Sequence, residues 1–148
     1  MDVILFFDGL CEPNPGGFCA WSYVLWLGKK CISDCGGFDP SPNTTCNFAE
    51  WCALGFGLKK LKSLNLPDIE SLTILGDSKL VVMQLDDRWR TKAEKLILLR
   101  NRCREMLADF PDWVARWIPR ELNHHADSLC NKAYKEWQES LRQNHGAK

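Results

Sequence analysis

The sequence predicts an α/β fold in which a mixed β-sheet carries helices on its faces. Three strand-like segments follow one another in the first quarter of the chain, which indicates strands joined by hairpins. After residue 43, helical and strand-like segments alternate, which indicates parallel strands connected through helices. The 148 residues, 45% hydrophobic and 26% charged, suffice for one domain with a buried core.

The three consecutive strands are predicted from local composition. Residues 2–7 are predicted to form a buried strand because residues 3–7 are a continuous apolar run, and residues 18–27 are rich in aromatic and β-branched side chains. The segment from Asp8 to Gly17 contains several Gly, Pro and Asn residues and predicts a loop. Gly28 begins a hairpin turn that leads into a third strand at residues 31–38.

The remainder of the chain predicts four helices and two strands. In order, we expect a helix capped by Thr44 or Thr45 and ending near Leu64, a strand at 70–76, a short helix from Lys79 to about Leu85, a helix capped by Thr91 and ending near Ala108, a strand at 113–118, and a helix capped by Asn123 and ending near Leu141. The sequence therefore predicts a single domain over residues 1–142 and a flexible tail at 143–148.

Composition excludes several classes of protein. No apolar run is long enough to span a bilayer, and the start of the chain lacks the features of a signal peptide, so we expect no membrane association and a cytoplasmic location. The formal net charge is zero, which gives no overall attraction to nucleic acid but allows a local basic groove. None of the eight cysteines forms a C-x-x-C pair, so we expect reduced thiols rather than structural zinc or disulfides.

Four acids occupy unusual positions. Asp8 follows the apolar run 3–7, and Asp77 follows a second strand-like run. Glu50 lies on the apolar face of a predicted helix, and Asp127 lies in the first turn of the last helix. Buried carboxylates are costly unless a cation compensates them, and parallel strands bring their carboxyl ends together. A shared divalent metal site would account for all four.

Each acid also has a simpler explanation when it is taken alone. Asp8 can be a turn residue and Asp77 a helix N-cap, while Glu50 and Asp127 can be acids that stabilise the positive end of a helix dipole. These alternatives remain open at the level of the sequence.

Four short motifs follow one another over nearly the whole chain. They are Asp8-Gly9 with Cys11 and Asn14-Pro15-Gly16-Gly17, then Thr45-Cys46-Asn47-Phe48-Ala49-Glu50, then Gly76-Asp77-Ser78, and finally Pro119-Arg120-Glu121-Leu122-Asn123-His124-His125-Ala126-Asp127. In this order they resemble the type 1 ribonuclease H family. No single motif is decisive, but the four together are specific.

The resemblance implies a ribonuclease H-like fold, a five-stranded mixed sheet whose first three strands are antiparallel. It implies an endonuclease that hydrolyses the RNA strand of RNA–DNA hybrids with two Mg²⁺ or Mn²⁺ ions. Asp8, Glu50, Asp77 and Asp127 match the family's catalytic, metal-binding carboxylates. Two ions can activate the attacking water and stabilise the leaving oxygen, and hard oxygen ligands suit Mg²⁺.

The resemblance also implies contacts with the hybrid. The candidate substrate-binding residues are Gly9, Cys11, Asn14, Thr45, Cys46, Asn47 and Arg120. For Asn14 and Thr45, a turn and a helix cap are the structural alternatives.

The chain departs from the family pattern in three places. Cys46 stands where asparagine is common, and a thiol is a weaker hydrogen-bonding group. The loop histidine that many members carry is absent, and His124 and His125 come too late to replace it. Some members carry a basic, tryptophan-containing segment between two helices, the basic handle. Here this segment is the short stretch 86–92, which is mixed in charge, and its Trp89 could touch the DNA strand or pack internally.

Other functions compete with the expected one. A nuclease of the same fold could cut junctions or single strands, and a module that binds nucleic acid without cutting it would keep the fold but need not keep all four acids. An interaction protein could use the seven tryptophans as an interface, but this leaves the acids unexplained. We expect a monomer that acts on RNA–DNA hybrids.

Overall fold

The computed structural model describes residues 1–110 and 112–146 and contains one five-stranded sheet in the order β3-β2-β1-β4-β5. The elements are β1 (Asp2–Glu12), β2 (Phe18–Leu27), β3 (Lys30–Phe38), α1 (Cys46–Ser63), β4 (Ser71–Gly76), α2 (Lys79–Leu85), α3 (Glu94–Leu107), β5 (Trp113–Trp117), the 3-10 turn η1 (Arg120–Asn123) and α4 (His124–Gly146). The first three strands pair antiparallel, and β4 pairs parallel with β1 and with β5. The predicted mixed sheet is confirmed.

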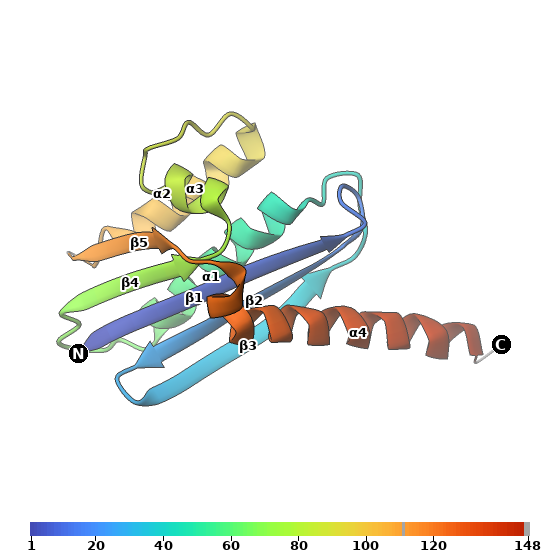
Figure 1. Cartoon of the computed structure of the whole chain (residues 1–148), viewed down its shortest axis with the longest axis horizontal. Coiled ribbons are helices and arrows are strands. Elements are labelled where there is room, and N and C mark those ends of the chain that lie inside the picture. The colour runs from blue at the N-terminus through green and yellow to red at the C-terminus, as the bar shows by residue number, and fades with distance from the viewer. Residues whose placement is uncertain (111, 147–148) are drawn as a thin grey trace.

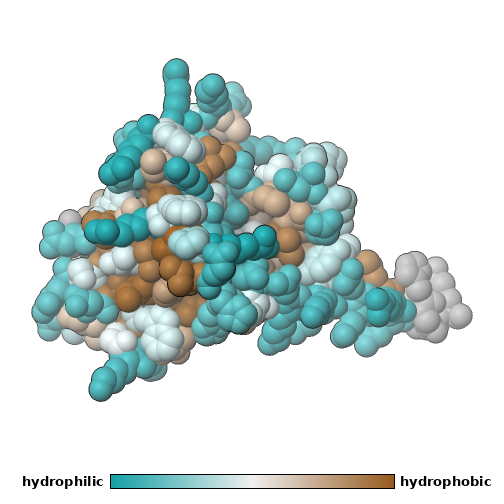
Figure 2. Space-filling model, viewed as in Figure 1, coloured by the Kyte–Doolittle hydropathy of each residue, from teal (hydrophilic) through white to brown (hydrophobic). Residues whose placement is uncertain are grey.

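Helices cover the two faces of the sheet unequally. α1 packs on β1 and β2 and is backed by α3, while α4 crosses the opposite face over β1, β2 and β3 (Figure 1). The main core lies between the sheet and α1, where Leu5, Leu54 and Ile74 are fully buried. On the α4 side, hydrophobic side chains gather over the part of the sheet that α4 leaves uncovered (Figure 2). None of the helices within the described residues could cross a membrane.

The boundaries of β1, α3 and α4 differ most from the sequence prediction. β1 continues to Glu12 rather than ending at Phe7, because residues 8–12 pair with 18–22 of β2 and extend the hairpin. α3 begins at Glu94 with Ala93 as its N-cap, so the predicted cap at Thr91 is wrong. These differences arise because pairing with a neighbouring strand or helix outweighs local turn and cap propensities.

The last helix is longer than predicted. α4 continues to Gly146, and its far end projects beyond the sheet (Figure 1). Aromatic packing supports part of the helix, since the rings of Phe18 and Trp137 stack with their centroids 4.6 Å apart. Of the predicted tail at 143–148, residues 147–148 lie outside the described residues, and the flexibility of the tail stays a prediction.

Candidate active site

Three of the four predicted acids meet where β1 and β4 run side by side. The last paired residues of this parallel ladder are Phe7 and Gly76, so Asp8 and Asp77 follow it on adjacent strands. Glu50, in the second turn of α1, reaches the same place. Each of the three residues offers a carboxylate oxygen that lies within 4.8 Å of the other two. They come together because the parallel ladder between β1 and β4 places the residues that directly follow it on the two strands side by side.

Local structure leaves these carboxylates free for a ligand. Thr45 caps α1 by accepting a hydrogen bond from the backbone N–H of Phe48 at 3.1 Å. Ser78, rather than Asp77, caps α2 by accepting from the N–H of Val81 at 3.3 Å. The capping explanation for Asp77 is therefore wrong, and its side chain is available to the cluster.

Burial and mutual repulsion raise the pKa values of the three clustered acids. Burial, followed by the charges of the neighbouring acids, raises the pKa of Asp8 to about 8. Burial, together with the charge of Asp77, raises the pKa of Glu50 to about 7. Burial also raises the pKa of Asp77, against an opposing effect of the Arg120 cation. Three acids that oppose one another's ionisation are a pattern typical of sites that hold a cation.

The donor set fits a hard divalent cation. The Oε2 atom of Glu50 is buried and makes no hydrogen bond with any described residue. An unpartnered buried carboxylate oxygen is costly unless a ligand satisfies it. Carboxylate oxygens are the ligands that Mg²⁺ and Mn²⁺ prefer.

Asp127 stands slightly apart from the other three acids. It lies in the first turn of α4 and its Oδ1 atom is 3.5 Å from a guanidinium nitrogen of Arg120. Its charge nevertheless contributes to the raised pKa values of Asp8 and Asp77. The structure thus assembles a cluster of three acids with a fourth, paired acid beside it.

Gly9 is required by the approach of α1 to β1. A Cβ atom at this position would lie 2.4 Å from the backbone nitrogen of Glu50 and 2.6 Å from the carbonyl carbon of Ala49. Because backbone atoms cannot move aside as a flexible side chain can, only glycine lets Glu50 come this close to Asp8.

Gly9→Ala is therefore expected to destabilise the protein by about 1–3 kcal/mol, the usual cost of overpacking. Gly55→Ala is the matched control, since a Cβ there meets only the Cys103 Sγ atom at 3.8 Å. The control should be neutral or stabilising, because alanine favours a helix over glycine by about 1 kcal/mol. Urea unfolding measures both variants, and equal stabilities would contradict the close-approach argument.

The predicted substrate residues gather around the start of α1. The Asn14 side chain accepts a hydrogen bond from the N–H of Cys46 at 3.2 Å. The Cys46 thiol lies 3.8 Å from the carbonyl oxygen of Cys11. Thr45 adjoins them as the N-cap, and Asn47 is the second residue of α1. Arg120 lies in η1, where it pairs with Asp127.

Asn123 has a different role from the predicted one. Its side chain is buried and its Nδ2 atom donates to the carbonyl oxygen of Phe7 at 2.9 Å, whereas its Oδ1 atom accepts from no described group. Asn123 directly precedes α4 as predicted, but its side chain makes no capping hydrogen bond with the described residues and instead ties η1 to β1 directly before Asp8. The contact fixes the start of α4 relative to the acids.

Two further residues support the acids and were missed in the sequence. Ser22, opposite Asp8 in the β1–β2 ladder, is fully buried and donates to the carbonyl oxygen of Ala126 at 2.6 Å. The Cys130 thiol lies 3.3 Å from the Ser22 hydroxyl and 3.4 Å from the carbonyl oxygen of Asp8. A serine inside an otherwise apolar strand was the available signal, since buried hydroxyls require partners.

Comparison with known proteins gives consistent matches. A family model described as reverse transcriptase-like matches residues 7–133. A ribonuclease HI of Halobacterium salinarum is 39% identical over 131 residues, which is 88% of this chain but only 63% of that protein. The crystal structure of ribonuclease H1 from the same archaeon has a TM-score of 0.81 at 31% identity, covering 92% of this chain and 99% of that one.

A further structural neighbour contains substrate. It is a ribonuclease H1 solved in complex with an RNA/DNA hybrid, with a TM-score of 0.82 at 24% identity over 92% of this chain and 99% of that chain. At this identity the likeness concerns the fold.

Proposed function

Because the chain belongs to the type 1 ribonuclease H family, we propose that it hydrolyses the RNA strand of RNA–DNA hybrids. The observation that carries this proposal is the cluster of Asp8, Glu50 and Asp77 at the sheet edge. The chain spans 63% of the length of the archaeal ribonuclease HI, so the activity is proposed for the part that the two share.

The family uses divalent metal ions, and we assign two Mg²⁺ or Mn²⁺ ions to this site. Asp8, Glu50 and Asp77 would hold them, with Asp127 as the fourth carboxylate. When bound, two such ions supply an activated water and stabilise the leaving 3′-oxygen. The protein's own part is to hold the carboxylates rigidly, through Ser22, Asn123 and the Gly9 contact.

Asp127 is the acid whose surroundings can change. Its partner Arg120 has a largely exposed side chain, so this ion pair can open at little cost. With this pair open, Asp127 would be free to serve as a metal ligand and Arg120 to contact the hybrid backbone. The guanidinium fork suits a phosphate contact.

The residues around the start of α1 are proposed to contact both strands of the hybrid. Asn14, Thr45 and Asn47 offer polar groups to the two strands, and the 2′-hydroxyl must distinguish RNA from DNA. The Cys46 thiol is directed to the Cys11 carbonyl, so one polar contact to substrate is expected to be weaker than with asparagine.

A gel assay tests the proposal. Labelled RNA–DNA, RNA–RNA and DNA–DNA duplexes, a four-way junction and single strands are each incubated with the protein and Mg²⁺, with and without EDTA. Cleavage confined to the RNA of the hybrid, and abolished by EDTA, is expected. Cleavage of the junction or of single strands would identify another nuclease specificity, and binding without cleavage would identify a non-catalytic module.

Binding to hybrid is expected to be weak and sensitive to salt. A chain of zero net charge with a reduced basic handle makes few phosphate contacts, and each contact is lost as counterions compete. Fluorescence anisotropy with labelled hybrid in Ca²⁺ at increasing salt measures this. Tight binding that hardly changes up to about 0.2 M salt would contradict it.

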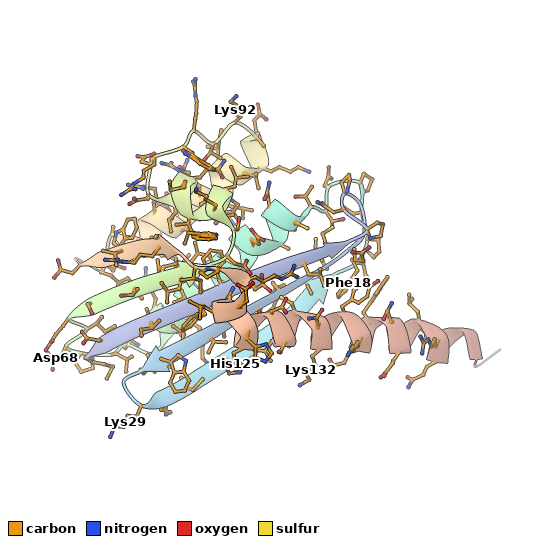
Figure 3. All side chains as sticks on the ribbon, in the orientation of Figure 1. Phe18, Lys29, Asp68, Lys92, His125 and Lys132 are labelled. Carbon is orange, nitrogen blue, oxygen red and sulfur yellow. The ribbon has the colours of Figure 1, made fainter. Side chains whose placement is uncertain are left out.

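The two adjacent histidines are expected to contribute little to the reaction. His124 and His125 are exposed in the first turn of α4, where the helix is tied to β1 through Asn123, and Figure 3 labels His125 at this helix start. Replacing both by alanine should therefore cost far less than the roughly 10²–10⁴-fold typical of a general acid or base. A loss of kcat beyond about a hundredfold in a folded variant would show that a histidine transfers a proton here.

A monomeric state and a cytoplasmic location remain predictions. Gel filtration with light scattering measures the first, and imaging of a tagged protein measures the second.

A further inference from the structure

A groove that no assigned function explains runs between α2 and the free edge of β5. It has a volume of about 620 Å³ and is lined by Lys79, Val82, Met83, Asp86, Arg88 and the whole of β5. β5 is an edge strand, since it pairs only with β4 in the sheet. Trp117 is 49% exposed and Val114 is 44% exposed, so β5 adds aromatic and aliphatic surface to the lining of the groove.

The groove is locally basic on a chain of zero net charge. Three cations line it, Lys79, Arg88 and Arg116, against one acid, Asp86. Arg88 is paired with Asp86 at 2.9 Å. Lys79 and Arg116 take part in no ion pair within the described residues, so two positive charges are available to a ligand.

The groove is continuous with the acid cluster. The indole N–H of Trp117 donates to the carbonyl oxygen of Asp77 at 3.0 Å. The N–H of Ile118 donates to the carbonyl oxygen of Gly76 at 3.0 Å. Trp117 therefore joins the groove to the acid cluster.

We propose that this groove binds single-stranded nucleotides that flank the hybrid, which rests on the proposed function. Phosphates would lie on Lys79 and Arg116, and a base would stack on Trp117. Basic grooves with exposed aromatic rings are the usual way in which proteins hold single strands without reading their sequence. An extended peptide pairing with the edge of β5 is the competing occupant, but the adjoining phosphodiester site and the excess of positive charge favour nucleic acid.

Arg116→Glu tests the groove, because the residue is exposed and lies outside the acid cluster. Steady-state cleavage compares a blunt hybrid with hybrids that carry a single-stranded RNA flank at either end. We expect the KM for the hybrid whose flank reaches the groove to rise about fivefold. Its kcat, and the KM and kcat for the blunt hybrid, should stay unchanged. Arg116→Lys should restore the wild-type KM. Arg142→Glu, on the far end of α4, is the matched control with the same charge change.

Two outcomes would overturn the groove proposal. One is an equal change of KM for blunt and flanked hybrids, and the other is no change for any substrate, which would leave the peptide as the better occupant.

A binding measurement separates this proposal from the proposed function. Anisotropy of a labelled single-stranded RNA requires no cleavage, so it can be measured even if no hybrid is cut. Arg116→Glu should weaken this binding and lower the slope of log affinity against log salt by about 0.7, the value for one single-strand phosphate contact. An unchanged slope would overturn the groove while leaving hybrid cleavage untouched.

Discussion

Asp77→Asn is expected to abolish magnesium-dependent cleavage of an RNA–DNA hybrid while the fold survives. Asp77 shares the cluster with Asp8 and Glu50, and an amide is a much weaker ligand for Mg²⁺ than a carboxylate. Since the site has few protein ligands, the loss of one should remove ion binding and hence the activated water.

The same substitution is expected to leave the metal-free protein equally or more stable. In the absence of metal, the charge of Asp77 raises the pKa values of both Asp8 and Glu50, so it opposes their ionisation. Removing it relieves this repulsion, as happens when a buried uncompensated charge is replaced by a neutral side chain.

Cleavage kinetics, circular dichroism and thermal unfolding test both parts. Asp39→Asn is the control, because Asp39 is an exposed acid in the loop after β3 and does not belong to the cluster. A folded Asp77→Asn variant that retains more than about a tenth of wild-type kcat would exclude Asp77 as a metal ligand.

The metal-free protein is expected to lose stability as the pH rises from about 5 to 8. The pKa values of Asp8 and Glu50 are raised in the folded protein to about 8 and about 7, above the ordinary values of 3.8 and 4.5. Between these limits the folded state holds protons that the unfolded chain has released. By linkage, the stabilisation from these bound protons is fully present at low pH and is lost as the pH rises through the folded-state pKa values of Glu50 and Asp8.

Mg²⁺ is expected to reverse this loss, and more strongly at pH 8 than at pH 5. The ion binds the ionised carboxylates, so at low pH it must displace protons. At a concentration about 100 times its Kd, it would stabilise the folded protein by about 2.7 kcal/mol. Thermal unfolding across pH, with Mg²⁺ or EDTA, measures both effects.

The result that would contradict this account is a metal-free stability that stays level or increases between pH 5 and 8. Asp77→Asn provides an internal check, since it removes one of the repelling charges and should flatten the pH dependence. A variant with the wild-type pH dependence would show that the cluster is not its source.

The strands and most of the site were predictable because they depend on local patterns. Continuous apolar runs identify the paired parts of β1 and β4, and parallel pairing of these runs sets the residues that follow them side by side. That geometry is enough to place Asp8 beside Asp77. The apolar face of α1 then directs Glu50 to the same edge.

The sequence by itself determined the order of the elements, the mixed sheet and three acids that meet. Tertiary structure alone decided that β1 continues past Asp8, that Asn123 binds the Phe7 carbonyl rather than capping α4, and that Asp127 pairs with Arg120. It also decided that a basic groove opens along β5. The physical reason is that apolar periodicity is a property of the local sequence of one segment. The partner of a polar group instead depends on which segments the fold brings together.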